Sequence, residues 1–504
     1  MRPLKRVKAW LRRPSIGSLR KSDTSFHRQW RDLSDPRDNA QYRIPDGEEL
    51  SLAGIIVVEA FTPSTIQNLM DALPSMADAP AEIAQEIRAS RSTSTRREWR
   101  TLPPILPQSS VAGPFGFRAA LPHGIEAAWL SIDQPTPSLT VIVATFTVAE
   151  TRGDLAPELR AIRATYADDP KLVVRGRLAH IRSRVPWARP KDMRVTRTIL
   201  DVRAQHARAV QSHVEAVRTE CQNWLTSRAR GMFGGSGLGD HPYALILLTG
   251  QAEPFAKQPG PNWLGPAGLG APTYWASPQL PQWRLAIKDG RWTFAARRSV
   301  AYPLDQATSG PPSNWDVSQR VHEDLSRLLS LWAASQALLV GEKRLSRIRD
   351  SARPRRRTWG VVREARRVEE FLLTQAFDAI SIARDLARLS DDEWAYRWEV
   401  PPFTVIEPFG ADRPSTEASS GATAPEAALS DVPEENKGLL GTQIRSFHRI
   451  MSAQLLIDVE ATRQTLVAYA QLAGVESNTR LQRVVVALAV LAILISVASA
   501  WFHV

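Results

Sequence analysis

The longest uninterrupted apolar stretch of the chain lies at its C-terminal end. Residues 484–502 carry no charge, and only Ser496 and Ser499 are polar. An uncharged stretch of about twenty residues predicts a helix that crosses a bilayer. The alternative, a buried core helix, is usually shorter and amphipathic. The predicted span runs through Val484, Leu488, Ala492, Ser496, Ala500 and Phe502.

The flanking charges predict the orientation of this span. Arg480 and Arg483 precede it, and only two residues follow it. The positive-inside rule then places the preceding domain in the cytoplasm. The predicted localisation is therefore the cell membrane, as a single-pass, tail-anchored protein.

The hydrophobic pattern of residues 43–312 predicts a mixed α/β domain. An apolar run over residues 55–58 predicts a buried strand, and Thr62 begins a helix whose apolar positions recur every three or four residues. Alternating positions on both sides of Asp289-Gly290 predict a hairpin. Further expected elements are strands at 127–132 and 139–148, paired as a hairpin with a longer loop, a helix over 204–225 and a strand over 243–248.

The pattern changes to a helical period after residue 315. Helices are expected up to Asp350 and again over 361–386, which predicts a helical hairpin region spanning residues 315–403. A Pro-, Ala-, Ser- and Glu-containing stretch at 408–437 predicts a disordered linker. The seam from Leu440 to Leu466 predicts a coiled-coil-like stalk helix over 438–482. The fold class expected from the whole pattern is α+β, followed by a helical hairpin, a stalk and one C-terminal transmembrane helix.

The charge of the chain adds candidate contacts with anionic surfaces. The formal net charge is +12, and basic residues concentrate in the first 31 positions and between Lys343 and Arg367. This favours the lipid bilayer as a partner over nucleic acid. Two interpretations of the N-terminal segment, residues 1–42, stay open: a disordered tail and a short basic amphipathic helix. The cluster Arg355 to Arg357 lies between the two predicted helices, at the tip of the helical hairpin. Three interpretations of this tip stay open: a solvated turn, a contact with lipid head groups and a contact with nucleic acid. The candidate contacts with an anionic surface are Arg355, Arg356, Arg357, Arg480 and Arg483.

No catalytic or cofactor motif is found. The glycine-rich segment Gly231–Asp240 follows a helix and precedes a strand, which is the reverse of a phosphate-binding loop, and it lacks the required lysine. It is interpreted as a flexible connection, with a ligand-lining role as the alternative. His206, His213 and Glu220 recur every seven residues, too far apart along a helix for ordinary metal ligation, so a solvated stripe is expected. Cys221, the only cysteine, is expected to be a small core residue.

The order of these parts resembles the outline of CorA-type divalent-cation channels. An α/β domain, long helices and a stalk that enters a C-terminal span are common to both. The chain ends Trp501-Phe502-His503-Val504, without the second span and the Gly-Met-Asn signature of that family. The resemblance implies an oligomeric stalk and carries over no ion-selecting residue.

These observations favour an interaction, sensing or scaffold protein that forms homo-oligomers through its stalk and span. Ala489, Ala492, Ser496, Ser499 and Ala500 would share one face of the span and allow close helix contact. The α/β domain would bind a protein partner or a small ligand, without cofactor or metal. The alternatives are an enzyme with scattered site residues in the α/β domain, and a CorA-like transporter or pore component.

Overall fold

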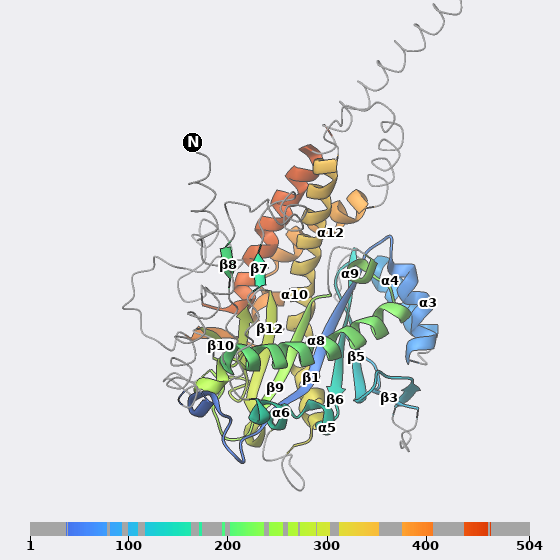
Figure 1. Ribbon diagram of the computed structural model, residues 1–504. Coiled ribbons are helices and arrows are strands. Elements are labelled where there is room, and N and C mark those ends of the chain that lie inside the picture. Colours follow the sequence, from blue (N-terminus) through green and yellow to red (C-terminus); the bar gives the residue numbers. More distant parts are fainter. Residues whose placement is uncertain are drawn as a thin grey trace, which may run out of the picture.

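Figure 1 shows a computed structural model of the chain, in which a large twisted sheet carries helices on both faces. Thin grey traces mark the residues that are not described. The structure describes residues 37, 39–77, 81–92, 99–108, 116–162, 171–173, 194–196, 202–235, 241–255, 261–270, 273–288, 290–302, 312–351, 375–406, 438–461 and 464.

The main sheet has eleven strands, ordered β13-β10-β11-β12-β9-β1-β6-β5-β3-β4, with β2 paired to β5. Only two of its pairs are parallel, β12 with β9 and β3 with β4. A separate pair joins β7 (Lys171–Val173) and β8 (Arg194–Thr196). The bounds in the main sheet are β1 Leu50–Phe61, β2 Trp99–Thr101, β3 Ile105–Pro107, β4 Phe117–Ala119, β5 Ile125–Thr136, β6 Leu139–Val148, β9 Tyr243–Thr249, β10 Tyr274–Ala276, β11 Arg284–Lys288, β12 Arg291–Arg297 and β13 Thr404–Ile406.

Strand β1 lies at the centre because both of its faces are apolar. All twelve of its residues are buried. Alternate side chains enter two different cores: Ile55 and Val57 pack on one side of the sheet, and Ile56 and Val58 on the other. A strand covered on both faces has a continuous apolar sequence, and the run predicted at 55–58 is the middle of this longer strand.

One face of the sheet is covered by helices from the first half of the chain. Helix α8 (Val202–Arg228) runs across the strands in Figure 1, and its buried residues Val210, Val214 and Leu225 join the core on that face. Helices α3 (Ile66–Ala77) and α4 (Ala81–Ser92) lie on the same side. Short helices complete the described part, namely α5 Glu150–Gly153, α6 Ala156–Ala161, α9 Met232–Gly235, and the 3-10 turns Asn262–Leu264 and Arg298–Val300.

The opposite face is covered by helices from the second half of the chain. Helix α10 (Asn314–Ser351) packs on β1, β5 and β6. Helix α12 (Gln375–Asp391) and the helical residues 440–461 pack beside α10, with Ile382 and Leu455 buried in the same core. The short helix α13 (Trp394–Arg397) follows α12, and β13 then joins the sheet edge. Sheet and helices on this face therefore share one core.

Two predicted hairpins are confirmed. Strands β11 and β12 pair on either side of Gly290, which has the positive φ of 73° that the tight turn requires. Strands β5 and β6 pair as well, but β5 continues through Pro135 and only two residues separate the strands. The longer loop expected there is wrong. A register shift between Asp133 and Thr136 accommodates the proline, which donates no ladder hydrogen bond.

The predicted fold class needs a correction. Among the described residues, no helix has both the length and the apolar character needed to span a membrane. The longest, α10, packs along the sheet and carries charged residues on both sides of an uncharged middle at residues 328–341. The transmembrane helix, and with it the single-pass membrane protein, is therefore not supported. The described part is a mixed α/β fold built on the eleven-stranded sheet.

Several predicted site residues lie outside the described residues. These are the residues of the expected span, Val484, Leu488, Ala492, Ser496, Ala500 and Phe502, and the expected anionic-surface contacts, Arg355, Arg356, Arg357, Arg480 and Arg483.

Candidate functional site

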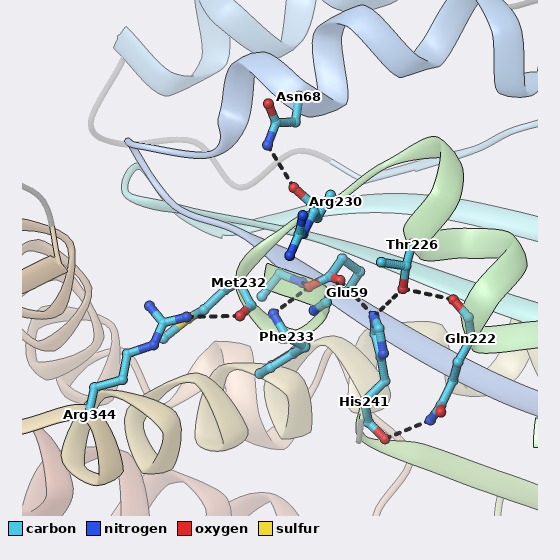
Figure 2. A network of polar contacts seen from close by, with 11 residues as sticks. Glu59, Asn68, Gln222, Thr226, Arg230, Met232, Phe233, His241 and Arg344 are labelled. Carbon is cyan, nitrogen blue, oxygen red and sulfur yellow. Dashed lines mark hydrogen bonds and ion pairs between the residues drawn. The ribbon is translucent and has the colours of Figure 1, made fainter. Parts of the chain in front are cut away.

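A buried carboxylate anchors the glycine-rich segment to the central strand. Glu59 of β1 is fully buried, and Figure 2 shows its contacts with α9 and His241. Its oxygens accept hydrogen bonds from the backbone N–H of Phe233 at 2.7 Å and Gly234 at 2.9 Å, and from Ala60 at 3.0 Å. The ring N–H at Nε2 of His241 donates to the same carboxylate at 2.7 Å.

The Glu59 contacts describe a structural anchor. A carboxylate has about four lone-pair positions, and four donors occupy those of Glu59. Gly231 is required beside it, because a Cβ at that position would overlap the carbonyl oxygen of Ala60. The first half of the segment predicted as a flexible connection is thus helical and held in the core, while residues 236–240 lie outside the described residues.

A second polar cluster joins α12 to the start of α3. The Asp378 carboxylate is buried; it accepts hydrogen bonds from the Thr62 hydroxyl at 2.6 Å and the Ser64 backbone N–H at 3.1 Å, and one from the Ser64 hydroxyl. A carboxylate is favourable there because the first N–H groups of a helix carry partial positive charge. Burial lowers the pKa of Arg91 to about 10, while the charge of Asp378 opposes that shift. The cluster is thus an internal joint between α12 and the sheet domain.

Two buried histidines each lie between two hydroxyl groups. His322 of α10 contacts the hydroxyls of Ser131 and Thr145, each at 2.9 Å, and joins α10 to β5 and β6. Burial lowers the pKa of His322 to about 3, so the ring is neutral at physiological pH.

The second histidine has the spacing of a nucleophile and a base. His448 contacts the Ser335 hydroxyl at Nε2 and the Tyr396 hydroxyl at Nδ1, both at 2.8 Å. The Ser335 hydroxyl also lies 3.3 Å from the carbonyl oxygen of Leu331, one helical turn earlier. A nucleophile and its base must also be within reach of a substrate. All three side chains are buried, and the arrangement joins three helices.

Among the aromatic side chains that the structure describes, the two most exposed belong to α13 and the residue that follows it. Trp394 and Trp398 are each 62% exposed, and their ring centroids lie 5.8 Å apart. The backbone N–H of Trp398 donates to the carbonyl oxygen of Trp394, so the rings stand one helical turn apart on the same side. The guanidinium of Arg397 lies 5.1 Å from the centre of the Trp398 ring. We call Trp394, Arg397 and Trp398 the α13 platform.

The inner side of α13 holds the platform in place. Ala395 and Tyr396 are buried between the two tryptophans in sequence. Tyr396 is fixed by His448, and the carbonyl oxygen of Tyr396 packs so closely on Gly441 that a Cβ there would overlap it. Glu399, just after the platform, pairs with Arg327 of α10 at 2.8 Å. The two exposed rings therefore stand on a well-packed support.

The other residues singled out in the sequence lie on α8, in different environments. Cys221 is fully buried on α8, as expected, and burial raises the pKa of its thiol. The solvated stripe on α8 is wrong: His206 is buried, and Glu220 pairs with Arg152 at 2.9 Å. Burial lowers the pKa of both His206 and His213. In the described part of the chain, histidine, cysteine and acidic side chains form no group of three suited to a metal ion.

The sequence contained a signal for the α13 platform that its interpretation did not use. Tryptophans at positions i and i+4, with acidic residues before them and a smaller buried pair between them, place two rings on the outer face of a helical turn. This segment lies near the end of the helical region predicted for residues 315–403. Whether the two tryptophan rings are exposed depends on which side of α13 packs against the helix of residues 440–461.

No protein-family model, no curated protein and no solved structure matches the chain. The resemblance to CorA-type channels therefore stays a prediction.

Proposed function

We propose that this protein is an interaction protein that binds a partner protein through the α13 platform. The observation that carries the proposal is the pair of tryptophans, each 62% exposed, on a short helix whose inner side is buried. Tryptophan and arginine are the residues most enriched among those that dominate binding energy at protein interfaces.

The energetics of the two rings support this proposal. A tryptophan side chain has roughly 200 Å² of surface, and burying apolar surface contributes about 25 cal/mol per Å². Two rings that are more than half exposed thus leave several kcal/mol, to order of magnitude, to be gained when a partner covers them. Large aromatic side chains also lose little conformational entropy on binding, particularly on a rigid support.

The internal hydrogen bonds of four buried ionisable residues also favour a binding function over a catalytic one. Glu59 and Asp378 accept several internal hydrogen bonds, and His322 and His448 each lie between two hydroxyls. A catalytic acid or base needs a hydrogen-bonding position that can reach the substrate. The hydrogen bonds of these four residues instead join helices to the sheet or to one another.

Site-specific photo-crosslinking would test the proposal. A benzophenone amino acid would replace Trp394 in the full-length chain, expressed in the organism that encodes it. The control would carry the same residue at Phe377, which is 58% exposed on α12. We expect a crosslinked partner band from position 394 that is absent or much weaker from position 377. Equal crosslinking from both positions, or none from position 394, would contradict the proposal.

A further inference from the structure

The charges around the α13 platform indicate the chemistry of its partner. Resting on the proposed function, we infer that the platform binds an arginine- and lysine-rich peptide segment of the partner protein. The inference joins two features: acidic residues next to the exposed tryptophans in the sequence, and a guanidinium that already lies over one of the two rings.

The first feature is a concentration of acidic residues in a short segment of a basic protein. Residues 391–399 contain four acidic side chains and one arginine, whereas the whole chain has a formal net charge of +12. Glu393 is shared by Arg397 at 3.2 Å and Arg445 at 3.5 Å, and Glu399 is paired with Arg327.

Two of these acidic residues lie shortly before α13 in the chain. Asp391 and Asp392 are exposed, and neither has an ion-pair partner among the residues that the structure describes. Asp392 accepts the backbone N–H of Trp394 at 3.0 Å. A cationic segment would compensate both charges, whereas an acidic segment or a nucleic acid phosphate would be repelled.

The second feature is an arrangement inside the chain that a partner can repeat. Arg397 lies over the Trp398 ring and pairs with Glu393, so one guanidinium contacts an aromatic face and a carboxylate together. At the neighbouring Trp394, the Asp392 carboxylate accepts the backbone N–H, and within the described residues no cation lies over the ring. An arginine or lysine of the partner would complete the same arrangement at Trp394.

A peptide-binding measurement tests the inference. The purified full-length chain would be titrated against a fluorescent twelve-residue peptide that alternates arginine and lysine with leucine and alanine. A second peptide would carry glutamate in place of each basic residue. Four proteins would be compared: wild type, Asp391→Asn with Asp392→Asn, Trp394→Ala with Trp398→Ala, and a charge-matched control, Glu82→Gln with Glu323→Gln, which changes two exposed carboxylates elsewhere. Asparagine keeps the helix-capping ability of Asp392, so the first variant should fold normally.

We expect the basic peptide to bind the wild type and the control equally, within about two-fold. Binding should weaken at least ten-fold in the Asp391/Asp392 and Trp394/Trp398 variants and fall with added salt. Equal binding to the Asp391/Asp392 variant, or equal binding of the acidic peptide, would overturn the inference. If the basic peptide does not bind while crosslinking from position 394 persists, the basic partner is wrong and the proposed function stands. If crosslinking from position 394 is also absent, both fail.

Discussion

Glu59 and His241 are 182 positions apart in the chain, and their side chains meet in a 2.7 Å hydrogen bond inside the protein. The contact joins His241, just before β9, to β1, and the same carboxylate also holds the α9 backbone. It shows how the described part of the chain uses its buried charge to fix the positions of helices.

Replacing Glu59 should therefore destabilise the fold. In Glu59→Gln, the amide nitrogen faces N–H donors that previously met a carboxylate oxygen, and charged hydrogen bonds are lost. We expect the free energy of unfolding to fall by about 2 to 4 kcal/mol. Urea denaturation followed by circular dichroism measures this change. Glu82→Gln, at an exposed position, is the control and should change the value by less than about 0.5 kcal/mol. An equally small effect at Glu59 would contradict the anchoring role.

The pH dependence of stability should report His322. Burial lowers the pKa of His322 to about 3 in the folded protein, whereas an unfolded histidine has a pKa of about 6.5. Between these values the unfolded chain binds a proton that the folded chain does not. Stability is therefore fully present above pH 6.5 and is lost as pH falls, by up to about 1.4 kcal/mol per pH unit. His206 and His213 add in the same direction because burial lowers the pKa of each.

A substitution shows how much of this pH dependence of stability comes from His322. His322→Asn removes the titrating group. Between pH 4 and 6, the free energy of unfolding of this variant should therefore change less steeply with pH than that of the wild type, by an amount that corresponds to about one bound proton. The measurement is the denaturation free energy at several pH values. An unchanged slope would show that His322 is protonated in the folded state.

The thiol of Cys221 should react only when the chain unfolds. The residue is fully buried on α8, and burial raises the pKa of the thiol, so the reactive thiolate is scarce. Labelling with an alkylating reagent, followed by mass spectrometry, should show no modification under native conditions and complete modification in urea. Rapid native labelling would place Cys221 in an accessible environment.

The support of the α13 platform can be tested at Gly441. A Cβ at this position would overlap the carbonyl oxygen of Tyr396, whereas a Cβ at Gly438 would meet nothing within 4 Å. Gly441→Ala should cost about 2 to 4 kcal/mol through steric overlap. Gly438→Ala, a matched control three residues earlier, should change stability by less than about 1 kcal/mol. Equal thermal unfolding of the two variants would contradict the packing of α13 on this helix.

Local elements of the fold could be predicted because their signals are local. The alternation around Asp289-Gly290 fixes the β11–β12 hairpin, and the apolar run at residues 55–58 marks β1. The helical period of residues 204–225 identifies α8. In each case the side chains that determine the element lie within one or two turns or strands of each other.

The surroundings of those elements could not be predicted in the same way. His206 was expected in solvent, but α6 packs on α8 and the ring is buried. Asp378 and Thr62 are 316 positions apart, so no sequence spacing relates them. The platform tryptophans share their helix with a buried tyrosine, and only the helix of residues 440–461 decides which aromatic side chain faces solvent. These relationships depend on tertiary contacts that a hydrophobic pattern does not encode.

The binding affinity of the partner isolated by crosslinking tests the central claim most directly. Calorimetry with the purified full-length chain would compare the wild type, Trp394→Ala with Trp398→Ala, and Phe377→Ala, which removes an exposed aromatic ring outside the platform. We predict a dissociation constant at least ten-fold higher for the double variant, or about 1.4 kcal/mol or more, and a change below two-fold for Phe377→Ala. Equal dissociation constants for the double variant and the wild type, with both proteins folded, would contradict the α13 platform as the binding surface.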